Sequence, residues 1–148
     1  MSKGPIWFGG ALPPLDQLTA LGTNAMPGHI GIEFTGAGDD WLAARMPVDA
    51  RTHQPYGRLH GGASVALAET VGSVAAANTV DREKFATVGM EINANHIRPA
   101  YSGWVVATAR PENLGRTTQV WSIRVEDEGG KLVCISRLTV AVIALERK

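Results

Sequence analysis

Apolar and polar residues alternate along much of the second half of the chain, a pattern typical of β-strands. Turn sequences rich in glycine, proline, serine or aspartate separate the alternating stretches. This arrangement predicts an antiparallel meander of four strands. We expect the strands at residues 86–98, 103–114, 117–126 and 131–144. Two shorter stretches, 29–35 and 41–46, flank a Gly-Ala-Gly-Asp-Asp turn and predict a β-hairpin upstream of the meander.

Two helices are predicted before the meander. Leu15, Leu18 and Leu21 recur every three residues after a Pro-Pro pair, which predicts a short N-terminal helix ending at Gly22. Residues 63–79 contain no proline, and small or aliphatic side chains lie on nearly every side, as in a helix that is buried all round. A sheet of such long strands must curl around this helix to bury it. The predicted fold is therefore α+β, a long curved antiparallel sheet wrapped around one central helix.

The other segments complete a one-domain organisation. The chain has 148 residues, which is enough for one hydrophobic core. Residues 47–62 contain Pro55 and three glycines and lack periodicity, which predicts a long loop of functional importance. Residues 1–12 are rich in glycine and aromatics, and we expect them to form an arm that either frays or packs on a neighbour. The single domain is expected to span residues 13–148.

Composition narrows the class of function. Fourteen basic and 14 acidic residues give a formal net charge of zero, so no overall field favours nucleic acid or an anionic membrane. The sequence has neither a signal-peptide pattern nor an apolar run long enough to span a bilayer, which predicts a cytoplasmic location.

Cys134, the single cysteine, lies in an alternating stretch and is expected to be structural. His29 and His53 lack partners at metal-ligand spacing, so no metal is expected.

Glu69 is the one ionisable side chain between His60 and Val80, in the middle of the apolar helix. Burying an unpaired carboxylate is unfavourable, so Glu69 must find donors, bind a proton, or face a pocket that solvent can reach. A carboxylate in such a pocket is a candidate for catalysis. The alternative is a structural ion pair with Arg45 or Arg58.

His60, Gly61 and Gly62 immediately precede the helix. The two glycine amides are expected at its positive end, where unpaired N–H groups can form an oxyanion hole. The alternative is that the glycines merely make a tight turn. Glu69 lies eight residues after Gly61, about 12 Å along a helix, so the two cannot reach one carbonyl group. Two chains with antiparallel helices could bring them together, and we therefore expect a dimer.

The run His60-Gly61-Gly62 followed by Leu67-Ala68-Glu69 resembles the active-site helix of the hotdog-fold acyl-CoA thioesterases. The chain is similar in particular to the bacterial group of 4-hydroxybenzoyl-CoA, 1,4-dihydroxy-2-naphthoyl-CoA and enterobactin proofreading thioesterases. The resemblance covers residues 15–145 and continues through motifs at 46–49, 54–55, 91–96, 114–115 and 136–139. It implies a hotdog fold and an enzyme that hydrolyses an acyl thioester. No cofactor is implied, because coenzyme A is part of the substrate.

The resemblance also implies roles for individual residues. Glu69 corresponds to the nucleophile or general base, Gln54 and the Gly61 amide hold the thioester carbonyl, and Ser73 places Glu69 or the attacking water. His60 shapes the acyl pocket and supports the leaving thiolate. Substrate and coenzyme contacts are implied for Gly62, Gly89, His96, Ile97, Arg98, Pro99, Asn113, Leu114, Gly115, Arg116 and Thr117. Without the resemblance, Gln54 could be an ordinary loop residue, Ser73 could bond back to the helix, and each arginine could be a solvated charge.

Two other functions are compatible with these residues. Hotdog hydratases and dehydratases also act on acyl thioesters, but with a histidine and a carboxylate directed at a β-hydroxyacyl chain. A non-catalytic acyl-CoA-binding module would not require Glu69. Within the thioesterase interpretation, an aryl or hydroxyaryl acyl group is favoured, and medium-chain groups are compatible. The carrier is coenzyme A or acyl carrier protein, and the assembly is a homodimer or a dimer of dimers, that is, a homotetramer.

Overall fold

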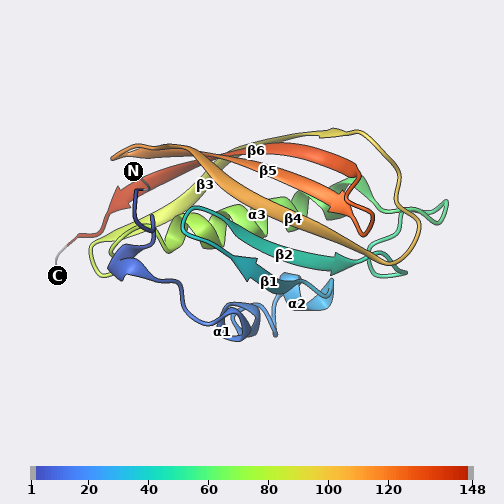
Figure 1. Ribbon diagram of the computed structural model, residues 1–148, viewed down its shortest axis with the longest axis horizontal. Coiled ribbons are helices and arrows are strands. Elements are labelled where there is room, and N and C mark those ends of the chain that lie inside the picture. Colours follow the sequence, from blue (N-terminus) through green and yellow to red (C-terminus); the bar gives the residue numbers. More distant parts are fainter. Residues whose placement is uncertain (1–2, 147–148) are drawn as a thin grey trace.

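Six antiparallel strands form a long sheet that curves around one central helix in the computed structural model, which describes residues 3–146 (Figure 1). The strands are ordered β1-β2-β4-β5-β6-β3 across the sheet. The helices are the 3-10 helix η1 (Phe8–Gly10), α1 (Leu15–Ala20), α2 (Met26–His29) and α3 (Gly61–Ala77). The strands are β1 (Glu33–Ala37), β2 (Leu42–Pro47), β3 (Phe85–His96), β4 (Trp104–Leu114), β5 (Thr118–Asp127) and β6 (Leu132–Ala144). This is the hotdog arrangement that was predicted.

The four strands predicted as a meander lie within two residues of their predicted bounds. Their predicted order was wrong, because only β4, β5 and β6 form a meander, and β3 pairs with β6 instead of β4. The edge of β4 that a meander would give to β3 is occupied by β2. The hairpin prediction was only partly correct, because residues 29–32 are not a strand. Pro27 lies in the first turn of α2, where a proline is readily accommodated, and Gly31 has a φ of 75°. A left-handed residue interrupts a strand, so β1 begins only at Glu33.

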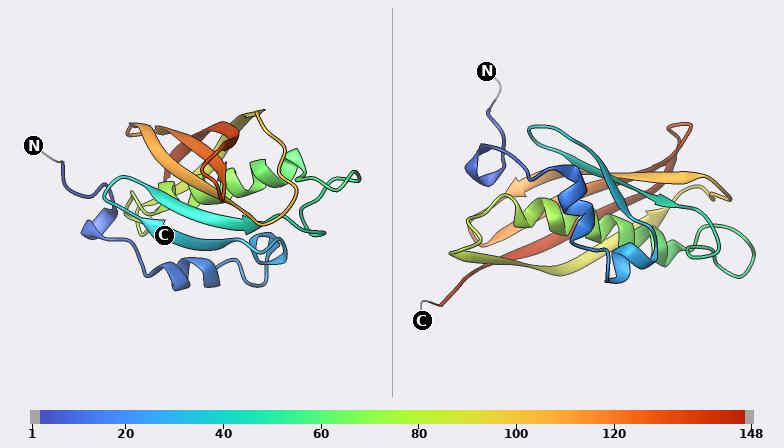
Figure 2. Two further views of the ribbon diagram at one scale, coloured as in Figure 1. Left: turned by 45° about the vertical axis from the view of Figure 1, so that its right-hand side comes forward. Right: turned by 90° about the horizontal axis from the view of Figure 1, so that it is seen from below.

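Helix α3 begins at Gly61, two residues earlier than predicted, and it is not buried all round. Leu67 and Val71 are fully buried against the sheet, whereas Gly62 and Glu69 on the other side are exposed. Figure 2 shows the sheet arching over the helix, with α1 and α2 on one flank. A single sheet covers only one face of the helix, so part of α3 faces away from the chain's own core.

Close packing holds the covered face of α3 against the strands. A Cβ atom on Gly72 would lie 2.7 Å from Cδ2 of Leu138, so the glycine lets the helix approach β6 closely. Trp121 and Ile123 of β5 are fully buried beside this contact. Each large apolar side chain that is fully buried contributes about 1.5–3 kcal/mol. Cys134 on β6 is also fully buried, and this burial raises the pKa of its thiol, as expected for a structural cysteine.

Strand β3 forms one edge of the sheet, and within residues 3–146 it pairs with β6 alone. Val88 and Met90 on this strand are 48% and 65% exposed. A long edge strand with unpaired backbone groups and exposed apolar side chains is a template for pairing with another chain. Among the described residues, no helix is both long and apolar enough to span a membrane.

The N-terminal arm packs on its own domain. Trp7 is only 5% exposed, and its Nε1 donates a hydrogen bond to the Gly38 carbonyl at 2.8 Å. The Ile6 amide donates to the Asp39 carbonyl at 2.9 Å. The expectation that the arm frays or packs on a neighbour was therefore wrong for these residues, because the indole ring fills the core. Residues 1–2 lie outside the described part of the chain.

We predict that Trp7→Ala lowers the free energy of unfolding by about 3 kcal/mol, because it removes a buried indole and leaves a cavity. Phe8→Ala is the matched control, since Phe8 is 57% exposed. It should cost less than about 1 kcal/mol. Urea unfolding followed by circular dichroism measures both variants. Equal stability of Trp7→Ala and wild type would show that the arm does not contribute to the core.

Candidate active site

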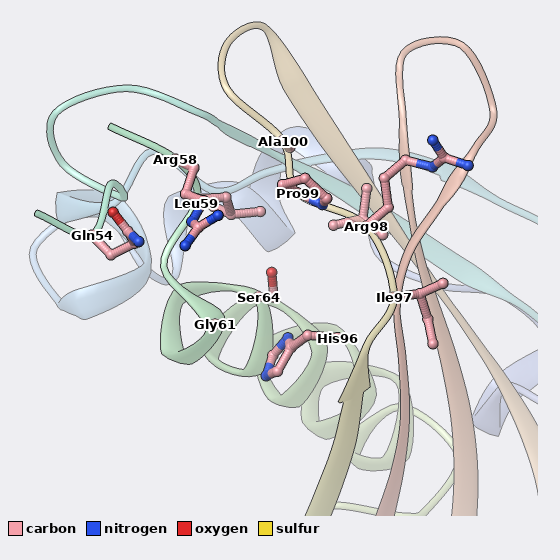
Figure 3. A pocket seen from close by; sticks show the side chains of 11 residues that line it. Gln54, Arg58, Leu59, Gly61, Ser64, His96, Ile97, Arg98, Pro99 and Ala100 are labelled. Atoms are coloured by element: carbon pink, nitrogen blue, oxygen red, sulfur yellow. The ribbon is translucent and has the colours of Figure 1, made fainter. Parts of the chain in front are cut away.

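A pocket with a volume of about 340 Å³ opens at the N-terminal end of α3 (Figure 3). One wall is the loop between β2 and α3, and the facing wall is the chain leaving β3. The pocket is lined by Gln54, Arg58, Leu59, Gly61, Ser64, His96, Ile97, Arg98, Pro99, Ala100 and Val133. Six of these residues, Gln54, Gly61 and His96 to Pro99, were predicted site residues.

The loop before α3 is held in place by hydrogen bonds although it lacks regular structure. Thr52 is 2% exposed, and its hydroxyl donates to the Pro47 carbonyl at 2.6 Å. The His60 amide donates to the Thr52 carbonyl, and the Leu59 amide to that of Ala100, each at 2.8 Å. The last of these bonds ties the two walls of the pocket together. The pocket is therefore preformed in the single chain.

Gln54 lies at a tight turn within this loop. Its amide donates to the Arg58 carbonyl at 2.7 Å, and Gly57 between them has a φ of 82°. The Gln54 side-chain Oε1 accepts a hydrogen bond from the Tyr56 amide. Among residues 3–146 no acceptor receives a hydrogen bond from Gln54 Nε2, which leaves this group as a donor at the pocket rim.

His60 caps α3 and changes which amides are available. Its Nδ1 accepts a hydrogen bond from the Gly62 amide at 2.8 Å. A neutral imidazole that accepts at Nδ1 has its proton on Nε2. The prediction that both glycine amides are free was thus wrong for Gly62. No backbone acceptor among residues 3–146 receives the Gly61 amide, which remains a free donor at the positive end of the helix.

His96, at the end of β3, lies against the start of the helix. A Cβ atom on Gly61 would be 2.9 Å from the His96 Nε2, so a larger residue at this position would push the imidazole aside. The Arg98 guanidinium points away from α3, and Ile97 is 57% exposed (Figure 3). The end of β3 therefore directs His96 towards the helix, and the side chains of Ile97 and Arg98 point outward.

Glu69 lies two turns further along α3 and is exposed in the single chain. Neither arginine considered as a structural partner reaches it: Arg45 pairs with Glu33 at 2.8 Å, and Arg58 lines the pocket. No ion pair to Glu69 forms within residues 3–146. A Cβ atom on Gly89 would lie 3.2 Å from the Glu69 Oε1, so the carboxylate rests against a bare stretch of β3 backbone.

The remaining predicted residues lie outside this pocket. Ser73 is half-buried, one turn beyond Glu69. Leu114, Gly115 and Arg116 line a different pocket, beside the segment that follows α3. One chain therefore brings Gln54, Gly61 and residues 96–99 together, but it leaves Glu69, Ser73 and the 113–117 turn apart from them.

Sequence reasoning missed five residues of the pocket. Ser64 is 1% exposed, and its hydroxyl points into the pocket below Pro99 and Ala100 (Figure 3). A lone serine one turn from the helix start, in an otherwise apolar run, is a signal that could have found it. Arg58, Leu59, Ala100 and Val133 join the pocket through loop closure and the β3–β6 pairing, which the linear pattern does not specify. In the described part of the chain, no three histidine, cysteine or acidic side chains gather as a metal site would require.

Comparisons with known proteins point to one family. Residues 56–134 match the family model described as the thioesterase superfamily. The chain is 51% identical over 129 residues to the 1,4-dihydroxy-2-naphthoyl-CoA hydrolase of Escherichia coli, covering 87% of this chain and 94% of that protein. It is 50% identical over 129 residues to the proofreading thioesterase EntH of Cronobacter turicensis, covering 87% and 93%. A crystal structure of a mutant thioesterase from Pseudomonas aeruginosa superposes with a TM-score of 0.91 at 50% identity, covering 95% of this chain and 99% of that one.

We predict that His60→Ala destabilises the fold by about 1 kcal/mol, because the Gly62 amide loses its cap. Asn accepts hydrogen bonds at N-cap positions, so His60→Asn should recover most of the lost stability. Chemical denaturation of the three proteins measures the difference. If alanine and asparagine variants are equally destabilised, the imidazole stabilises the fold by packing and not by capping.

Proposed function

The chain belongs to the thioesterase superfamily and is a thioester hydrolase, and from this premise we propose that it hydrolyses an acyl-CoA thioester at a site shared by two copies. One observation carries the proposal: Glu69 is exposed and has no ion-pair partner within residues 3–146, while the Gly61 amide lies about 12 Å away along the same helix. A second chain in antiparallel orientation would place its own Gln54 and Gly61 opposite this carboxylate.

The carbonyl of the thioester would be held at the start of α3. The Gly61 amide lies at the positive end of the helix, and the free Nε2 group of Gln54 is a second donor nearby. Donors arranged before the reaction stabilise the negative charge that develops on the carbonyl oxygen. This arrangement suits a tetrahedral intermediate of acyl transfer.

Glu69 of the other chain would then carry out the hydrolysis. Its carboxylate either attacks the thioester carbon to form an anhydride that water cleaves, or removes a proton from an attacking water. In both routes the carbon–sulfur bond breaks and the thiolate leaves. The Nε2–H of His60 would donate a hydrogen bond to this sulfur, since Nδ1 is held by the Gly62 amide. Ser73, one turn from Glu69, would orient the carboxylate or the water.

A shared site would also bring together the two predicted coenzyme-binding segments, residues 96–99 and 113–117. If β3 pairs with the β3 of a second copy in antiparallel fashion, His96 of one strand lies towards Phe85 of the other. Phe85 lines the same pocket as Leu114, Gly115 and Arg116. The stretch 96–99 of one chain and the turn 113–117 of its partner could then contact one coenzyme molecule.

The similarity to a dihydroxynaphthoyl-CoA hydrolase supports an aryl or hydroxyaryl acyl group. A thioester on an acyl carrier protein remains the second candidate, because the carbonyl-binding groups would contact the thioester and not the carrier. Hydrolysis assays with benzoyl-CoA, hydroxybenzoyl-CoA, octanoyl-CoA and an acyl carrier protein thioester would rank these substrates. A homotetramer and a cytoplasmic location stay predictions.

We predict that Glu69→Gln lowers kcat for benzoyl-CoA by roughly 10² to 10⁴, because an amide neither attacks the carbon nor accepts the proton. Binding of the intact thioester should change little, since the carbonyl donors are untouched. Steady-state kinetics and a binding titration measure the two effects. Glu128→Gln is the matched control, because this exposed carboxylate lies in the turn between β5 and β6. If the kcat of Glu69→Gln stays within tenfold of wild type, Glu69 has a structural role. If the wild-type protein adds water to an enoyl-CoA, the hydratase function is favoured instead.

We predict that Glu69→Gln and Gln54→Ala complement each other. Each homodimer should be nearly inactive, because loss of one carbonyl donor typically costs 10² to 10³ in rate. After subunit exchange, a mixed dimer contains one intact site, with Glu69 from one chain and Gln54 from the other. An equal mixture should regain about a quarter of wild-type activity, since half the dimers are mixed and each has one of two sites.

Native mass spectrometry would verify the exchange of subunits in this experiment. If mixed dimers form and activity stays at the level of the parents, Glu69 and Gln54 act within one chain and the shared-site proposal fails.

A further inference from the structure

A second pocket, of about 450 Å³, lies at the C-terminal end of α3, far from the first. The N-terminal arm contributes Phe8 to its wall, and the turn between β4 and β5 contributes Leu114 and Arg116. The segment between α3 and β3 contributes Lys84 and Phe85. The arm and the β2–α3 loop lie at opposite ends of the molecule (Figure 1), so this pocket is separate from the carbonyl-binding groups of the same chain.

The arm holds Phe8 in a defined position above this pocket. Its amide donates to the Asn78 carbonyl at 2.8 Å, at the end of α3. The neighbouring residue Trp7 is buried in the core and anchors the arm. Phe8 itself is 57% exposed although its backbone is fixed on both sides. An exposed aromatic ring on an anchored backbone is a preformed surface for a flat ligand.

The floor of the pocket is closed by hydrogen bonds among its own residues. Gln119 is 3% exposed, and its Nε2 donates to the Thr79 hydroxyl at 2.8 Å. Its Oε1 accepts from Trp121 Nε1 at 2.9 Å, and the Thr79 hydroxyl donates to the Ala76 carbonyl at 2.8 Å. These polar groups already form hydrogen bonds with one another. A ligand would therefore be recognised by the Phe8 ring and by the cations of the pocket walls.

Two cations stand at the pocket. Arg116 is exposed and forms no ion pair among residues 3–146. The Lys84 side chain is 68% exposed, and its Nζ lies 3.7 Å from the carboxylate of Asp81, which also lines the pocket. The other Asp81 oxygen accepts the Glu83 amide at 3.1 Å, so this carboxylate is engaged locally. Cations beside an aromatic ring suit a ligand that is both anionic and flat.

We propose that the N-terminal arm forms part of a nucleotide-binding pocket, in which the adenine of coenzyme A packs on Phe8 and its phosphates contact Lys84 and Arg116. The inference rests on the proposed function for the identity of the ligand, and it assigns Phe8 and Lys84, for which the family resemblance implies no role. The last residue of α3, Ala77, is eight residues beyond Glu69, about 12 Å along the helix, and the pocket lies beyond it, so the nucleotide would sit well away from the reacting carbonyl. The arm then selects thioesters that carry a nucleotide.

Titration calorimetry with free coenzyme A and with 4′-phosphopantetheine tests this assignment, because the second ligand lacks the adenine nucleotide. Wild type should bind coenzyme A about tenfold more tightly than phosphopantetheine, and Phe8→Ala should lose about fivefold for coenzyme A alone. Phe8→Trp keeps a ring and should retain the affinity. Lys84→Gln should weaken coenzyme A binding at low salt and less at high salt. Met26→Ala is the matched control, an exposed apolar residue in α2 that is 61% exposed.

Equal affinity of wild type for the two ligands would overturn the proposal, as would an unchanged coenzyme A affinity in Phe8→Ala. A Phe8→Ala variant that weakens both ligands equally would also overturn it, since the arm would then support the fold or the thioester end. These titrations contain no hydrolysis step. A failure of the proposed function, seen as no turnover of any acyl-CoA by wild type, is therefore distinguishable from a failure of this inference.

Discussion

The structure depends on a geometric constraint: one helix packs into a curved sheet that can cover only one of its faces. Leu67 and Val71 bury that face, while Glu69 on the other side faces away from the core. The chain therefore combines a stable hydrophobic interior with a carboxylate on a rigid element. The uncovered face of α3 adjoins β3, whose outer edge is open because the strand pairs with β6 on its other side.

Much of the fold was predictable because local patterns determine it. Alternation located the strands β3 to β6 to within two residues, since one face of each strand packs on α3. It did not show that β3 pairs with β6 instead of β4, because strand order depends on contacts between residues distant in sequence. The errors arose where tertiary context or cap chemistry overrides the pattern. An apolar run near Gly31 could not show the left-handed residue that separates α2 from β1. The indole of Trp7 is buried by contacts with residues distant in sequence.

Only part of the candidate site was predictable from the sequence, and there is a physical reason why the rest was not. Gln54, Gly61 and His96 were identified from motifs, and the structure places them around one pocket. The sequence alone could not show that the His60 side chain occupies the Gly62 amide, because this depends on a rotamer. Nor could it show that Arg58 enters the pocket, which depends on how the loop closes. The distance from Gly61 to Glu69 followed from the helix rise alone, and it was the basis for expecting a second chain.

Cys134 makes this protein convenient to assay. It is the single thiol of the chain, it is fully buried in β6, and burial raises its pKa, so little of it is present as the reactive thiolate. A thiol reagent added to the folded protein would therefore report the thiol released from a thioester substrate, with almost no background from the protein. When the protein unfolds, the same reagent would react with one cysteine per chain. A single colorimetric reagent can thus follow turnover under native conditions and global unfolding under denaturing conditions.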